Sequence, residues 1–151
     1  MKETMLAYKA ALVVAISTIG ELLGWKGIMM VAWVIAMAMD YISGTMAACK
    51  EGKWSSAVAR QGLWHKGGMI LVVAVSGMAD LVMLIICQHI PVTIPWPGLI
   101  LPLVLAWYTV TEMGSILENA VKMGAAVPGW LIKLLEAGAK AVEAMGEKQN
   151  E

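Results

Sequence analysis

Residues 28–49 form an almost wholly apolar stretch whose only charged side chain is Asp40. A helix of about 20 apolar residues crosses the roughly 30 Å hydrocarbon core of a bilayer. Backbone polar groups inside that core need hydrogen-bond partners within the protein, and a helix supplies them from its own segment. The stretch therefore predicts a transmembrane helix.

One face of this predicted helix combines small residues with a carboxylate. A stripe with a spacing of four residues consists of Ala32, Ala36, Asp40, Gly44 and Ala48. Small residues let two membrane helices approach closely, and an intramembrane Asp is costly unless it faces protein or water. The stripe thus packs against another helix or lines a wet path; the alternative is an Asp40 that is bonded inside one subunit.

Composition favours a polytopic membrane protein of the all-α class. Charged residues make up 15% of the 151-residue chain and hydrophobic residues 60%, whereas soluble domains carry roughly 25% charged residues. The apolar stretches predict four transmembrane helices, at about residues 5–23, 28–49, 67–87 and 98–118. Lys9 and Glu21 interrupt the first stretch, so the alternative is three spans with the first segment lying on the membrane interface.

Polar and glycine-containing segments separate the predicted spans. Residues 24–27 read Gly-Trp-Lys-Gly, which predicts a turn with Trp25 at the membrane interface. The basic loop at 50–66 is long enough for a short interfacial helix at 56–64. The loop at 88–98 is rich in proline, which blocks continuation of a helix.

A second region, residues 128–151, follows the predicted membrane domain at 1–127. Its apolar face consists of Leu131, Leu134, Leu135, Val142 and Met145. The side chains that lie away from this face are Lys133, Glu136, Lys140 and Glu143. This pattern predicts a cytoplasmic amphipathic helix that lies on the membrane surface or packs on a partner, followed by a polar tail.

Basic residues are distributed very unequally between the two sides of the predicted bundle. With four spans, Lys26 alone of the eleven Lys and Arg residues falls on one side. The positive-inside rule then places both termini in the cytoplasm of a bacterial cell. Cys49 and Cys87 fall on opposite membrane faces, so no disulfide is expected within one subunit.

Polar groups inside the predicted spans mark candidate helix-packing or pore-lining positions, because such groups are rare in hydrocarbon unless they have a partner. The candidates are Ala36, Asp40, Gly44, Ala48, Ser76, Asp80, Glu112, Ser115, Glu118 and Asn119. They form no nucleophile or metal-ligand arrangement, so we expect no enzyme, metal or cofactor. Nothing resembles a basic, aromatic-laced nucleic-acid surface.

Several stretches, taken in order, resemble the phage holin family that includes the clostridial toxin-secretion holins. They are Asp-Tyr-Ile-Ser-Gly at 40–44, Lys-Gly-Gly at 66–68, Glu-Met-Gly-Ser-Ile-Leu-Glu-Asn at 112–119, and Val-Pro-Gly-Trp-Leu at 127–131. The likeness covers roughly residues 10–135.

This resemblance implies a small inner-membrane protein that accumulates harmlessly and then assembles with its own copies into large lesions. The lesions collapse the proton-motive force and let an endolysin, a functional partner without implied direct contact, reach the cell wall. Related proteins assist toxin release. The family supplies no catalytic residues; its shared motif positions here are Asp40, Gly44, Glu112, Ser115, Glu118 and Asn119.

Two other functions compete with this interpretation. A small proton-coupled exporter of four-span subunits would place an essential Glu well inside its first span, whereas Glu21 lies near the outer end. A non-catalytic accessory subunit of a larger membrane complex is the second alternative.

Overall fold

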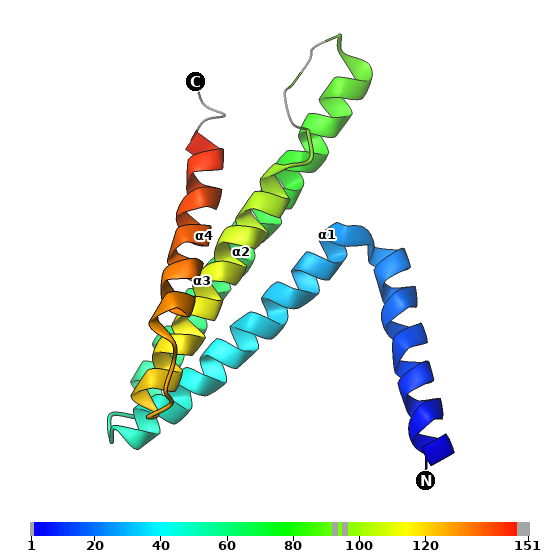
Figure 1. Ribbon diagram of the computed structural model, residues 1–151. Coiled ribbons are helices and arrows are strands. Elements are labelled where there is room, and N and C mark those ends of the chain that lie inside the picture. Colours follow the sequence, from blue (N-terminus) through cyan, green and yellow to red (C-terminus); the bar gives the residue numbers. More distant parts are fainter. Residues whose placement is uncertain (1, 92–93, 95–96, 148–151) are drawn as a thin grey trace.

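The computed structural model describes the backbone of residues 2–91, 94 and 97–147, and between residues 2 and 23 only the side chains of Met5 and Val14. This part of the chain forms four helices and contains no strand, which confirms the all-α prediction (Figure 1). The helices are α1 (Lys2–Lys50), α2 (Ser56–His89), α3 (Ile100–Lys122) and α4 (Gly129–Glu147).

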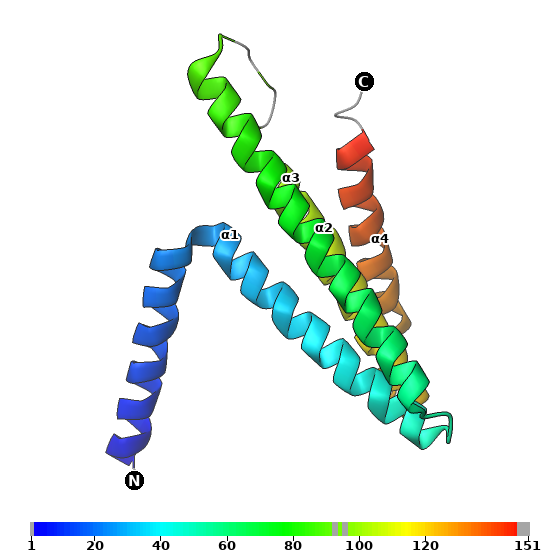
Figure 2. The same ribbon diagram turned by 180° about the vertical axis from the view of Figure 1, so that it is seen from behind.

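Helix α1 bends sharply at Gly24. This residue has φ of 60° and ψ of −178° inside otherwise helical backbone, a conformation that glycine adopts readily because it lacks a Cβ. The segment before the bend turns away from the other helices, as both views show (Figures 1 and 2). The two helical segments of α1 therefore join at a kink that falls within the turn predicted at residues 24–27.

Three helical segments of the described chain are long and apolar enough to cross a membrane. They are Gly24–Lys50, Ser56–His89 and Ile100–Lys122. For the further span predicted at about 5–23, the structure describes the helical backbone and only the side chains of Met5 and Val14. Large apolar side chains on these helices point outward, including Leu71 and Met78, which are 68% and 65% exposed. Such a surface suits lipid tails, which are as apolar as leucine.

Helix α3 lies at the centre of the bundle and packs against α1, α2 and α4, whereas α1 and α2 make few contacts with each other. Alternating steps of three and four residues on α2 bring its buried residues onto one narrow face. This face consists of Lys66, Met69, Val73, Ser76 and Asp80. The hydrophobic core joins it to α1 and α3 through Trp33, Met37, Met69, Val73 and Leu105.

Helix α2 begins earlier than the sequence predicts. Ser55 caps it, because its Oγ accepts a hydrogen bond from the Val58 backbone N–H at 3.2 Å. The helix then continues to His89, so the prediction of a separate interfacial helix at 56–64 is wrong. At 1.5 Å per residue its 34 residues measure roughly 51 Å, so the first turns extend beyond the hydrocarbon core.

Helix α4 runs antiparallel to α3 and packs along it (Figures 1 and 2). A Cβ built on Gly138 would lie 3.7 Å from Val110 Cγ1, so the helices approach closely there. The sequence placed this helix on the membrane surface or on a partner; it lies instead against α3 of the same chain. Leu134 and Met145, both on the predicted apolar face, are 61% and 57% exposed, because the contact side is centred on the small residue Gly138.

Candidate functional site

One charged side chain from each membrane-crossing helix meets at a common point. Lys66 Nζ on α2 donates a hydrogen bond to Asp40 Oδ2 on α1 at 2.7 Å. The same ammonium donates to Glu112 Oε2 on α3. A single cation therefore joins three helices. We call Asp40, Lys66 and Glu112 the ion-pair cluster.

The ion-pair cluster is shielded from solvent. The side chain of Lys66 is 11% exposed, and those of Asp40 and Glu112 are 19% and 4% exposed. Removing one partner from such a buried group leaves an uncompensated charge and costs about 3–5 kcal/mol. The three helices are thus coupled through buried charges.

A polar contact between α1 and α3 extends the ion-pair cluster. Asn119 Nδ2 donates to Asp40 Oδ1 and to Ser43 Oγ, both at 3.1 Å, and Ser43 Oγ in turn donates to the Asp40 carbonyl oxygen at 3.1 Å. Gly44 makes room for this contact, since a Cβ there would lie 3.4 Å from Asn119 Nδ2. Both carboxylate oxygens of Asp40 are therefore engaged, each by a different helix.

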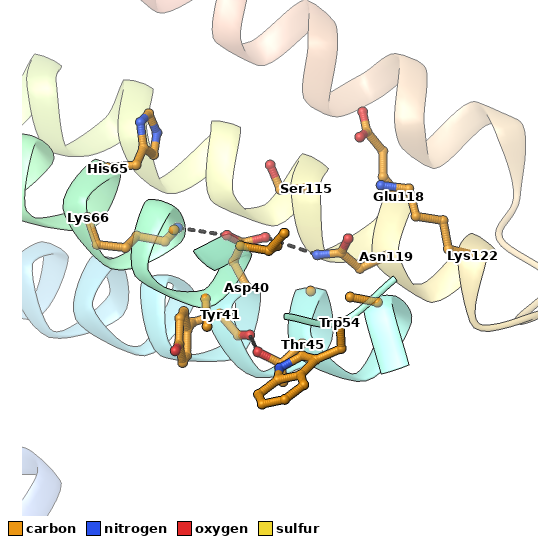
Figure 3. A pocket seen from close by; sticks show the side chains of 15 residues that line it. Asp40, Tyr41, Thr45, Trp54, His65, Lys66, Ser115, Glu118, Asn119 and Lys122 are labelled. Carbon is orange, nitrogen blue, oxygen red and sulfur yellow. Dashed lines mark hydrogen bonds and ion pairs between the residues drawn. The ribbon is translucent and has the colours of Figure 1, made fainter. Parts of the chain in front are cut away.

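Two cavities flank the ion-pair cluster, and Asp40, Lys66, His65 and Ser115 line both of them. The first, of about 330 Å³, lies between α1, α2 and α3; in Figure 3 Asp40 stands between Lys66 and Asn119, with dashed lines to each. The second, of about 520 Å³, is lined by residues of α2 and α3 that include Met69, Tyr108 and Glu112. Asp40 and Lys66 of the ion-pair cluster therefore line both cavities, and Glu112 lines the second.

The remaining sequence candidates lie in different places. Gly44, Ala48, Ser115 and Glu118 line the first cavity, where Glu118 is exposed. Ala36 is buried, with 6% exposure. Two candidates, Asp80 and Ser76, lie on the α2 face farther along the helix, away from the ion-pair cluster.

Asp80 has a structural partner of its own. Its Oδ1 accepts from the Ile100 backbone N–H and its Oδ2 from the Leu101 backbone N–H, both at 3.0 Å. These N–H groups belong to the first turn of α3, where helical donors lack intrahelical partners and negative charge is favourable. Asp80 therefore fixes the start of α3. Ser76 Oγ bonds within its own helix, to the Val73 carbonyl oxygen at 2.8 Å.

Replacing Asp80 with Ala is expected to destabilise the bundle by about 1–2 kcal/mol, because two N–H groups lose their acceptors. Asp80→Asn is the matched control: its amide oxygen retains one acceptor, so we expect a smaller loss. The thermal unfolding midpoint of the purified protein in detergent measures both. An Asp80→Ala midpoint equal to that of the wild type would show that Asp80 is not needed to start α3.

Lysines tie α1 to both ends of α3. Lys26 Nζ donates to the Gly98 carbonyl oxygen at 2.6 Å, just before α3 begins. Lys50 Nζ donates to the Met123 carbonyl oxygen, where α3 ends and unpaired carbonyl groups favour a cation. The ion-pair cluster lies between these two ties, so α1 is held to α3 at three levels.

Sequence reasoning missed Lys66 and Ser43 as site residues. The basic residues in 50–66, of which Lys66 is the last, predict a loop rather than a buried site residue. One signal in the sequence indicates Lys66. A carboxylate inside a span needs a cation or a hydrogen-bond donor, and Lys66 is the basic residue that directly precedes the next apolar run.

Metal ligation is not supported by the described residues. Among them, no group of three or more His, Cys, Asp or Glu side chains is arranged to hold a metal ion. Both Cys49 and Cys87 are free thiols. The described residues of the site interact by charge pairing and hydrogen bonding between helices.

Known proteins resemble this chain over most of its length. The family model of the bacteriophage holin family matches residues 17–139, which include the whole ion-pair cluster. An uncharacterized protein of Halalkalibacterium halodurans is 32% identical over 126 residues, which cover 83% of this chain and 87% of the relative. Uncharacterized proteins of Listeria monocytogenes and Listeria innocua are each 31% identical over 116 residues, covering 77% of this chain and 75% of the relative. No solved structure matches the chain.

The family match and the structure both indicate a helical membrane protein. Three apolar helices suit a bilayer, and three of the four segments that carry the resemblance meet in space, at Asp40 and Gly44 on α1, Lys66 on α2, and Glu112 and Asn119 on α3. With most of its length matched, the chain belongs to the bacteriophage holin family, a family of membrane proteins without enzymatic activity.

Proposed function

We propose that the chain acts as a holin: copies of it oligomerise in the bacterial cytoplasmic membrane and open lesions that dissipate the membrane potential. Endolysin, or a toxin in a secretion setting, then leaves through the lesions. The observation that carries this proposal is the ion-pair cluster, since it couples three membrane-crossing helices through charges that lipid cannot solvate.

The ion-pair cluster holds the three helices together before assembly. Asp40, Lys66 and Glu112 satisfy one another inside the bundle, so α1, α2 and α3 present mainly apolar side chains to lipid. Separation of the helices releases these charges, which then need water or new polar partners. Neighbouring copies can enclose such water, whereas lipid cannot, so opening is favoured only after copies have gathered.

The membrane potential gives this step an abrupt onset. Moving one elementary charge across a membrane is worth about 2.3 kcal/mol per 100 mV. The cluster residues lie in spanning helices, so a part of that field acts on their arrangement. A first lesion lowers the membrane potential. The equilibrium between closed bundles and separated helices then shifts in every other copy at once.

Regulated expression in a bacterial host tests the proposal. With an endolysin that lacks its own export signal supplied in trans, we expect growth during a lag, followed by sudden loss of a potential-sensitive dye signal and lysis. An uncoupler added during the lag should trigger lysis promptly. A potential that stays intact throughout contradicts the proposal: with resistance to a cation it indicates an exporter, and with no effect at all an accessory subunit.

The orientation of the chain is open to a separate test. We propose that the α1–α2 loop and the C-terminus lie in the cytoplasm, because the basic residues gather there. A C-terminal fusion to green fluorescent protein should fluoresce, and one to alkaline phosphatase should be inactive. The same pair fused at the N-terminus distinguishes the span counts: a cytoplasmic N-terminus requires four spans, and an external one requires three.

A further inference from the structure

The ion-pair cluster contains more acidic groups than basic ones. Two carboxyl groups, those of Asp40 and Glu112, share the single ammonium group of Lys66. If both carboxyl groups are ionised, one negative charge stays unbalanced inside the bundle, where the side chain of Glu112 is only 4% exposed. Burial of an unbalanced charge is costly, and carboxyl groups that share a site repel each other when both are ionised. A positive ion must therefore neutralise the cluster.

The hydrogen bonds indicate which carboxyl group stays ionised. Asp40 accepts from Lys66 Nζ through Oδ2 and from Asn119 Nδ2 through Oδ1, and two donors of this kind favour the charged form. Glu112 accepts from Lys66 through Oε2. No residue of the described chain donates to Glu112 Oε1, so this buried oxygen is free to carry a proton.

The other titratable side chains that line the two cavities do not offset the excess charge. They are Tyr41, His65, Tyr108, Glu118 and Lys122. His65, Glu118 and Lys122 are exposed, so water solvates any charge they carry, and the two tyrosines supply no cation. A bound metal ion would need several oxygen ligands, whereas a proton needs only one. The lining of the cavities thus favours a proton.

We infer that the bundle holds one proton on the carboxyl group of Glu112, at Oε1, beside the ion pair of Asp40 and Lys66. Glu112 Oε2 still accepts from Lys66, and the cluster as a whole then has no net charge. The proton belongs to the bundle of a single chain, so it does not depend on the proposed lesion-forming function. Separation of the helices releases it, because a hydrated Glu is ionised at neutral pH.

Denaturant titrations of the purified full-length chain in detergent test this assignment. Above about pH 5, where a hydrated Glu is ionised, the unfolding equilibrium constant of the wild type, divided by that of Glu112→Gln, should rise about tenfold per pH unit. The rise continues for as long as the bundle keeps its proton, since unfolding releases it. The amide of Glu112→Gln resembles the protonated carboxyl group and has no proton to release. Glu118→Gln is the control: its carboxyl group is exposed, so this variant should behave like the wild type.

Infrared spectroscopy detects the proton directly. At neutral pH the wild type should show the C=O stretching band of a protonated carboxylic acid, and Glu112→Gln should lack it. Carbon-13 labelling of the glutamate carboxyl groups shifts the band if it belongs to a Glu, so the assignment does not require a variant that folds. Asp40→Asn should also lose the band although Glu112 is unchanged, because one carboxylate then pairs with one ammonium group.

Three results would overturn the proton assignment. They are a wild-type spectrum without the acid band, a band that persists in Asp40→Asn, and a ratio of unfolding constants that follows the Na⁺ concentration instead of the pH. The last of these would indicate a metal cation as the neutralising ion. A chain that holds the proton but never dissipates the membrane potential would contradict the proposed function alone.

Discussion

Replacing Lys66 with Met is expected to lower the stability of the bundle by about 3–5 kcal/mol, because Asp40 and Glu112 lose the only cation that pairs with them in the described structure. Met matches the length of the Lys stem, so the change removes the charge while much of the packing is kept. The unfolding midpoint in detergent should fall, and the membrane potential of expressing cells should collapse earlier after induction.

Two further variants separate the ion-pair cluster from a general effect of lost charge. Lys53→Met removes an exposed ion pair in the α1–α2 loop, where Lys53 Nζ lies 2.8 Å from Glu51 Oε2 and lowers the pKa of that carboxyl. It should leave stability and timing unchanged, since surface pairs contribute little. The neutral triple variant of Asp40→Asn, Lys66→Met and Glu112→Gln should recover much of the lost stability, because no buried charge remains unpaired. If Lys66→Met unfolds like the wild type, the ion-pair cluster does not hold the three helices together.

The parts of the fold that depend on long apolar runs could be predicted from the sequence. The runs at 28–49 and 67–87 lie within α1 and α2, and the polar residues at 112–119 lie on α3. The spacing of Asp40 and Gly44 identified a face that in the structure meets Asn119. Periodicity of this kind depends only on helix geometry, so it can be recognised in the sequence without knowing which helices pack together.

The parts that depend on neighbours could not be predicted. Ala32 belongs to the predicted stripe but is exposed, whereas Trp33 and Met37 beside it are buried, because the position of α3 sets which side of α1 is covered. Lys66 was assigned to a loop since basic residues usually mark span ends. It lies within α2 because the helix already begins at Ser56, and the carboxylates that accept from it come from two other helices.

The contact at Gly44 shows why the size of one side chain matters in this membrane bundle. Helices in lipid gain nothing from hydrophobic exclusion, so their association depends on close packing and on polar contacts between them. At Gly44 both come together: a Cβ there would already touch Asn119 Nδ2 at 3.4 Å, and the same Nδ2 donates to Asp40 Oδ1 at 3.1 Å. A larger residue at position 44 therefore disturbs both the close packing and the polar contact between the helices.

Gly44→Leu is therefore expected to destabilise the α1–α3 contact by about 1–3 kcal/mol, since the added side chain overpacks the interface and pushes Asn119 from Asp40. The chain should still insert, and the time from induction to loss of membrane potential should change. Gly68→Leu is the matched control, because a Cβ at Gly68 meets nothing within 4 Å and the same mass is added to an exposed helical position. Normal timing and an unchanged unfolding midpoint in Gly44→Leu would mean that α1 and α3 do not need this close approach.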